Sequence, residues 1–300
     1  MSFDNAYESL LEDSDDAHWA YGTGFTDVLS DVDHAVPAGV DPAQLALCCM
    51  LLGDDALVMS QRLSEWCSWA PELEEDVALA NIALDLLGQA RLLYTRAVEV
   101  DPSIRPANAP AHVPAEDALA YFRDELDFRN VRLAEIDTGP GPAGDFAMTI
   151  ARLLVFASWR LAMFTRLTDA ADPVLAAIAA KGVKELAYHR DHAAQWTVRL
   201  GDGTEVSAAR MTAGLAAIWP LVSELCQPHP LDLVDMADVR TELDDVLDRV
   251  FAAASLDKPA VPAMAGVSGR TGRDGVHTAA LGYLLAELQH IARSHPQAVW

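Results

Sequence analysis

The stretch "GVKELAYHRDHAAQW" (182–196) carries acidic, imidazole and phenol side chains on one segment with helical hydrophobic spacing. Carboxylates and imidazoles are the ligands of di-metal sites in helical bundles. Such a site takes one Glu from each of two helices and Glu-x-x-His from each of the other two. The i, i+3 spacing sets both ligands of a pair on one helix face, so the stretch must be tested against that spacing.

The spacing within this segment does not match the metal-binding pattern. Glu185 and His189 fall on the hydrophobic stripe, so we predict that both point inward. The residue three positions after Glu185 is Tyr188, not histidine. His189 comes one position late, which rotates it by about 100° from the expected ligand position.

The other long segments lack ligands too. The second predicted helix offers Asp85, but three residues on stands Gly88, which has no side chain to ligate. The first helix offers Glu65, and the middle of the fourth, "LLVFASW" (153–159), has no carboxylate. We therefore predict no catalytic residue and no metal ligand, only the remnants of a metal site at Glu65, Asp85, Gly88, Glu185, Tyr188 and His189.

Alternative interpretations remain open for these side chains. Glu185 and Asp85 could be buried acids neutralised by hydrogen bonds or by a cation, surface acids, or metal ligands. His189 and His192 could be hydrogen-bonded bundle histidines or ligands. If they are ligands, the chain could be a catalytically active di-metal carboxylate oxidase with an irregular site of Glu65, Asp85, Glu185 and His189. The chain could also be a helical interaction protein without oxidation chemistry.

Three further motifs favour no other chemistry. Glu287 and His290 form a Glu-x-x-His pair, but on a short helix without a partner element. "GRTGRDG" (269–275) lacks the Lys and Ser/Thr of a phosphate-binding loop, and we expect a mobile or partner-gripping loop. The cysteines show no Cys-x-x-Cys spacing, and we expect buried, unreactive side chains at Cys48, Cys49, Cys67 and Cys226.

Composition excludes several classes of partner. The 45 acidic and 21 basic residues give a formal charge of −24, which repels phosphate backbones and anionic lipids. No unbroken apolar run approaches the ~18–20 residues of a membrane-spanning helix. The first residues lack the basic start of a signal peptide, so we expect a cytoplasmic protein that binds neither nucleic acid nor membrane.

The hydrophobic spacing predicts an all-α protein. Asp41, Asp145, Asp172 and Asp235 stand where helix N-caps are expected, and no segment has the pattern of a strand. Residues 1–40 contain nine acidic residues and no Lys or Arg, which predicts a separate arm that is mobile or ordered only against a partner. The helices are expected at about 42–69, 71–98, 115–136, 145–164, 172–200, 207–226, 235–254 and 277–293.

Two long helical pairs flank the helix at 115–136, and this order predicts the architecture. Hairpin, intervening helix and hairpin are the connectivity of a ferritin-like antiparallel bundle with a long crossover. Residues 41–300 would form one such domain with extra C-terminal helices. Its longest helices would measure about 40 Å.

Several segments resemble a known family. The longest is "LLGDDALVMSQRLSEWCSWAPELEEDVALANIALDLLGQAR" (51–91), and others are "YFRDELDFRNVRLAE" (121–135), "DFAMTIARL" (145–153), "DPVLAAIAAKGVKELAYH" (172–189) and "GVHTAALGYLLAELQ" (275–289). They are similar to the structural PaaC subunits of bacterial ring 1,2-phenylacetyl-CoA epoxidases. The resemblance covers about 50–226 and 270–300 and leaves the arm at 1–40 without a counterpart.

The resemblance implies a ferritin-like fold and a role in a complex. Such subunits have lost their own metal site and pair with a related PaaA-like subunit, whose di-iron centre epoxidises the aromatic ring of phenylacetyl-CoA. A small additional subunit joins the complex, and a separate flavin and iron–sulfur reductase supplies electrons from NADPH. No cofactor is then expected in this chain.

Overall fold

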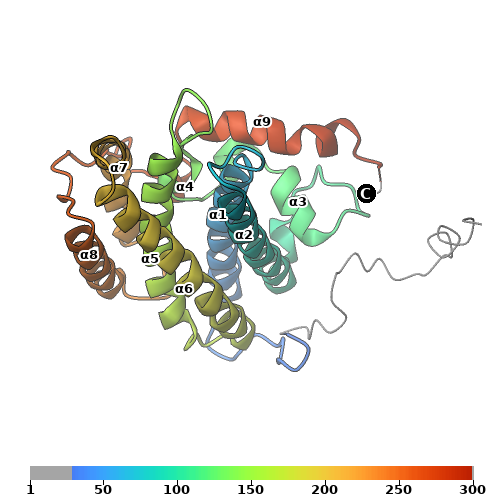
Figure 1. Cartoon of the computed structure of the whole chain (residues 1–300). Coiled ribbons are helices and arrows are strands. Elements are labelled where there is room, and N and C mark those ends of the chain that lie inside the picture. The colour runs from blue at the N-terminus through green and yellow to red at the C-terminus, as the bar shows by residue number, and fades with distance from the viewer. Residues whose placement is uncertain (1–28, 299–300) are drawn as a thin grey trace, which may run out of the picture.

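Two antiparallel helical hairpins form the centre of the molecule. The computed structural model describes residues 29–298, and within them α1 (Pro42–Ser64) packs on α2 (Leu73–Val100), and α5 (Phe146–Leu167) on α6 (Pro173–Gly201). Contacts between α2 and α6 join the hairpins, which stand side by side (Figure 1). The predicted all-α, ferritin-like bundle is confirmed, and no strand occurs in the described residues.

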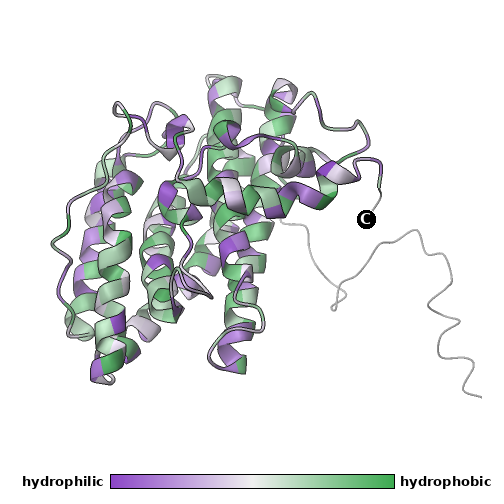
Figure 2. Cartoon of the chain, turned by 90° about the horizontal axis from the view of Figure 1, so that it is seen from above, coloured by the Kyte–Doolittle hydropathy of each residue, from purple (hydrophilic) through white to green (hydrophobic). Residues whose placement is uncertain are grey.

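The remaining helices cover this bundle on three sides. α7 (Glu205–Ile218) and α8 (Met236–Ala253) pack against α5, and α9 (Ala279–Ser294) lies across one end, in contact with α3 (Ala115–Tyr121) and α4 (Arg132–Glu135) (Figure 1). Hydrophobic and hydrophilic residues alternate around the helices (Figure 2). One continuous core results, with α5 almost wholly buried.

Local caps define where the long helices begin. The side chains of Asp41, Asp145, Asp172 and Asp235 each accept a hydrogen bond from a backbone N–H in the first turn of the following helix. These bonds satisfy donors that have no partner inside the helix. All four predicted N-caps are confirmed.

The predicted helix at 115–136 is wrong. The chain forms α3, a short 3-10 turn at Glu125–Asp127 (η3) and α4 instead. The N–H of Arg129 donates to Asp54 at 2.7 Å, and that of Val131 donates to Asp55 at 2.8 Å. These carboxylates of α1 take the place of helical acceptors, so the segment stays extended.

Two helix ends also differ from prediction. α1 ends at Ser64 instead of 69, and Ser68 in the following turn has a φ of 70°. The helix expected at 207–226 begins at Glu205, capped by Thr204, and becomes a 3-10 helix, η4 (Trp219–Cys226), at a segment that contains Pro220. The helix type is confirmed, and the boundaries shift by a few residues.

The expected burial of all four cysteines is wrong, and the glycine-rich loop is not mobile at its η5 turn, while binding of a partner by that loop stays a prediction. Arg273, in the 3-10 turn Gly272–Asp274 (η5), reaches into the bundle and bonds Asp55, so this part of the glycine-rich loop is anchored. Cys67 is exposed in the turn between α1 and α2, while Cys226 is half-buried. Burial raises the pKa of the Cys48 thiol to about 12, as expected for an unreactive side chain.

The predicted N-terminal arm lies mostly outside the described residues. Its last part does contact the bundle: Val32, Val36 and Val40 pack against the core. The backbone carbonyl of His34 accepts a hydrogen bond from Arg96 at 2.9 Å. Mobility of residues 1–28 stays a prediction.

Four helical segments are long and apolar enough to cross a bilayer when length and mean hydropathy alone are considered, although the sequence contains no unbroken apolar run of that length. The bundle buries most of two of them, 83% of the apolar window of α1 and 89% of that of α5. The other two, α2 and Glu205–Cys226, are 50% and 33% buried. Core packing thus accounts for the hydropathy of α1 and α5, and leaves apolar surface on α2.

Candidate functional site

Glu185 lies half-buried between the two hairpins, and protein groups neutralise it. Lys181, one turn earlier on α6, donates to its carboxylate at 2.7 Å. The amide of Gln89 on α2 donates to the other carboxylate oxygen at 2.9 Å. The interpretation of Glu185 as an acid satisfied by a cation and a hydrogen bond therefore agrees with this geometry.

A second cation, Arg160 of α5, lies deeper in the same region. Its Nε donates to Gln89 at 3.0 Å, so the amide of Gln89 links the guanidinium to Glu185. The side chain is fully buried, and its Nη1 and Nη2 have no hydrogen-bond partner among the described residues. Burial lowers the pKa of Arg160 to about 10, while the charge of Asp55 opposes that shift.

Asp85 and His189 form a separate pair across α2 and α6. The imidazole Nε2 lies 3.0 Å from the carboxylate. His189 is fully buried, as predicted, whereas the Asp85 side chain is 39% exposed. His192, one turn further along α6, lies 3.1 Å from Glu75, and burial lowers its pKa.

The two positions where the metal pattern requires histidine face away from the interior. Tyr188 is 53% exposed. Gly88 is half-buried on α2, and a Cβ placed there would meet no atom within 4 Å. Neither position contributes a group to the interior of the bundle.

Glu65 is not brought together with the other predicted positions. It caps the C-terminal end of α1 and accepts a hydrogen bond from Arg62 at 2.7 Å. Burial raises its pKa, although the positive charge of Arg62 opposes that rise. The structure therefore separates the six positions: Glu185 is half-buried between the hairpins, Asp85 pairs with His189, Gly88 is half-buried, Tyr188 is exposed and Glu65 lies at the end of α1.

This arrangement does not fit a di-metal centre. Within residues 29–298, no group of three or more His, Cys, Asp or Glu side chains is placed to hold a metal ion. The interior instead holds a guanidinium and a carboxamide beside a single carboxylate. Cationic and amide N–H groups donate hydrogen bonds, whereas a metal requires electron-pair donors.

A larger group of buried charges lies around α1 and was not predicted from the sequence. Asp54 is fully buried and accepts hydrogen bonds from Tyr94 at 2.6 Å and from the guanidinium of Arg123. Its neighbour Asp55 accepts from Arg273 at 2.8 Å. The sequence feature that points to this group is the pair Asp54-Asp55 within an otherwise apolar helix. From the sequence alone, the pair shows only that the apolar run is interrupted.

Comparison with known proteins places this bundle in a family. The model of the phenylacetic acid catabolic proteins matches residues 33–300. The chain is also 41% identical over 266 residues to the C subunit of 1,2-phenylacetyl-CoA epoxidase from Escherichia coli K12, covering 86% of this chain and 99% of that protein. The chain belongs to the phenylacetic acid catabolic protein family. The resemblance seen in the sequence is thereby confirmed.

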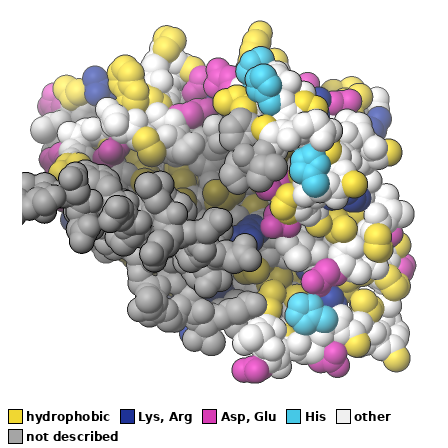
Figure 3. Space-filling model, turned by 90° about the vertical axis from the view of Figure 1, so that its right-hand side faces the viewer, with side chains coloured by type: hydrophobic (Ala, Val, Ile, Leu, Met, Phe, Trp, Pro, Cys, Tyr) yellow, Lys and Arg dark blue, Asp and Glu magenta, His cyan; other side chains and the backbone are white. Residues whose placement is uncertain are grey.

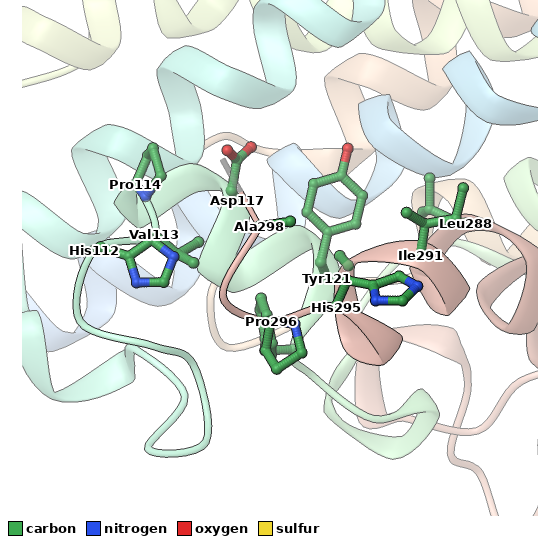
Figure 4. A pocket seen from close by; sticks show the side chains of 12 residues that line it. His112, Val113, Pro114, Asp117, Tyr121, Leu288, Ile291, His295, Pro296 and Ala298 are labelled. Carbon is green, nitrogen blue, oxygen red and sulfur yellow. The ribbon is translucent and has the colours of Figure 1, made fainter. Parts of the chain in front are cut away.

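One pocket lies away from the central bundle. It has a volume of about 540 Å³ between the loop before α3 and the end of α9, on the side shown in Figure 3. His112 and His295 lie on opposite sides of it (Figure 4). Burial raises the pKa values of Asp117 and Tyr121, which also line the pocket. No sequence motif pointed to this pocket, because the loop and the C-terminal helix are distant in sequence.

Proposed function

We propose that this chain is the structural, non-catalytic component of a 1,2-phenylacetyl-CoA epoxidase and carries out no chemistry by itself. Its role is to support a related, PaaA-like subunit that holds the di-iron centre and epoxidises the aromatic ring. The small additional subunit and the NADPH-dependent flavin and iron–sulfur reductase complete the proposed cytoplasmic complex. The support for this complex is the family membership and the 41% identity to a named component of that epoxidase.

The side chains between the two hairpins support a structural and non-catalytic role for this chain. Glu185 is paired with Lys181 and Gln89, and the fully buried Arg160 lies on the other side of that amide. A metal cation at this place would be repelled by the guanidinium of Arg160 and the ammonium of Lys181. We therefore assign the buried charges to holding the two hairpins together, with no cofactor in this chain.

The proposal is tested by reconstitution. The chain is co-expressed with a tagged PaaA-like catalytic subunit, and phenylacetyl-CoA turnover is assayed with the reductase and NADPH, with and without this chain. We expect co-purification and turnover that depends on the chain. A catalytic subunit that is equally active without it would contradict the proposed role.

A second measurement separates the structural from the catalytic assignment. Iron is quantified in the chain purified alone and supplied with ferrous iron under anaerobic conditions. We expect far less than one iron per chain. Near-stoichiometric iron whose removal by a chelator abolishes an oxidase activity would instead support the di-metal alternative.

A further inference from the structure

Helix α2 has a second hydrophobic stripe on its outer side. Its inner stripe, including Leu79, Leu86 and Leu93, is buried in the core. The α2 outer stripe is spaced by steps of four, three, four and three residues, and consists of Leu73, Val77, Ala80, Leu84 and Leu87. The outer face of a bundle helix is ordinarily polar, so this second stripe is not explained by the fold of the chain.

The larger side chains of the outer stripe are exposed. Leu73 is 73% exposed, Val77 52%, Leu84 63% and Leu87 43%. They lie along a helix that shares the face of the bundle with α6 (Figure 1). These exposed fractions show that the rest of residues 29–298 leaves the four side chains largely open to solvent.

The turn before α2 adds an exposed aromatic residue, since Trp69 is 70% exposed. Gly88 follows the stripe on the same helix, and a Cβ placed there would meet nothing within 4 Å. Apolar and small residues therefore continue beyond both ends of the stripe.

The spacing indicates what kind of element binds here. Steps of three and four average 3.5 residues, the repeat that keeps a hydrophobic seam facing a second helix in left-handed packing. A β-strand would match alternate residues, and a lipid surface requires no heptad. The acidic residues beside the stripe also disfavour anionic lipid.

The charges beside the stripe indicate the sign of the partner. Glu74 and Asp76 flank its first half. Arg91, at the far end, lies 3.2 Å from Glu116 and is therefore already paired. A second copy of this chain would bring acid against acid, whereas a helix with Lys or Arg beside its seam would be attracted.

We infer that the α2 outer stripe is the docking surface for one amphipathic helix of the catalytic subunit, with a heptad seam and basic flanking residues. The inference rests on the proposed function, which supplies the partner. In addition to the proposed function, the inference specifies the surface that binds, the type of element that docks there and the sign of the charge on that element.

The test replaces exposed side chains only, so that folding is preserved. Leu84→Glu and Val77→Glu are compared with Tyr283→Glu, a control on α9 at a residue that is 78% exposed. Each variant is checked by circular dichroism and thermal unfolding, then titrated against the tagged catalytic subunit. We expect about a tenfold or greater loss of affinity for the two α2 variants and wild-type affinity for the control.

The possible outcomes distinguish the two proposals. If the wild-type chain does not bind the catalytic subunit, the proposed function fails. If the wild-type chain and both α2 variants bind equally well, the proposed function stands and the docking surface is wrong. Sedimentation of the chain alone should give a monomer, and a dimer abolished by Leu84→Glu would overturn the choice of partner.

A charge variant tests the sign of the partner. Glu74→Lys reverses one exposed charge at the edge of the stripe without touching a hydrophobic side chain. We expect weaker binding than wild type and a reduced dependence of affinity on salt. Stronger binding would show that the partner helix is acidic there, which contradicts the inference.

Discussion

Arg160 places a guanidinium in the middle of the bundle with only its Nε bonded to another side chain among the described residues. Gln89 accepts this bond and donates a hydrogen bond to Glu185. Lys181, which is partly exposed to solvent, also donates to Glu185. Charges that are buried and linked in this way hold the hairpins in one register, because displacing either helix leaves a charge without its partner.

Asp54 is a fully buried acid whose carboxylate accepts hydrogen bonds from three residues. It accepts from Tyr94, from Arg123 and from the backbone of Arg129. Asp54→Asn would leave the buried Arg123 charge unpaired, and we expect the free energy of unfolding in urea to fall by about 3–5 kcal/mol.

Tyr94→Phe is the matched control for this change. It removes the hydrogen bond that Tyr94 donates to Asp54 and the one that it accepts from Arg123, and it keeps the ion pair between Asp54 and Arg123. The expected loss is about 1–2 kcal/mol. Equal losses in the two variants would mean that the ion pair contributes nothing beyond a hydrogen bond.

His277 makes the stability depend on pH. Burial lowers the pKa of this buried imidazole, but the hydrogen bond to Glu135 at 2.8 Å and the charge of Glu135 outweigh burial and raise the pKa overall. A raised pKa contributes stability that is fully present below the unfolded value of about 6.5 and is lost as pH rises through the folded value.

The variant His277→Gln should remove this contribution. We expect the wild type to exceed the variant in unfolding free energy by more at about pH 6 than at about pH 9, measured in urea. A difference that is independent of pH, or larger at the higher pH, would show that the imidazolium is not the stabilising form.

At the scale of elements, the sequence predicted the long helices because their signals are local. Capping aspartates and the spacing of apolar residues act within one or two turns. The segment 115–136 was mispredicted because Asp54 and Asp55 take its backbone donors from a distant helix. The inward orientation of His189 followed from periodicity, whereas Gln89, Arg160 and Arg273 were missed because only the packed structure brings them together.

Two glycines in the bundle helices give opposite predictions. A Cβ at Gly88 would meet no atom, whereas a Cβ at Gly182 would lie 2.7 Å from the ring of Phe164. Gly88→Ala should therefore stabilise the isolated chain by about 0.5–1 kcal/mol, because alanine favours the helix.

Gly182→Ala should instead destabilise the chain by about 1–3 kcal/mol, because the ring of Phe164 must shift. Thermal unfolding of the two variants beside wild type checks both signs. The packing of Phe164 against α6 would be contradicted if Gly182→Ala were as stable as Gly88→Ala.

At the scale of the whole molecule, one ferritin-like bundle carries apolar surface beyond what its own core requires. Composition predicted the sign of the surface charge, and the helical order predicted the architecture. The outer stripe of α2 was not recognised, because the same helix also provides an inner stripe and the sequence alone does not show which of them the core buries.

The central claim is that the polar residues of this bundle support the complex without taking part in its chemistry. The most direct test is phenylacetyl-CoA turnover by the reconstituted complex when this chain carries Asp85→Asn, Glu185→Gln and His189→Gln together, normalised to the amount of assembled complex. We expect turnover within about twofold of the wild-type complex, since within residues 29–298 the changed groups bond to each other, to Lys181 and to Gln89. Loss of turnover by a hundredfold or more from a complex that still assembles would contradict the central claim.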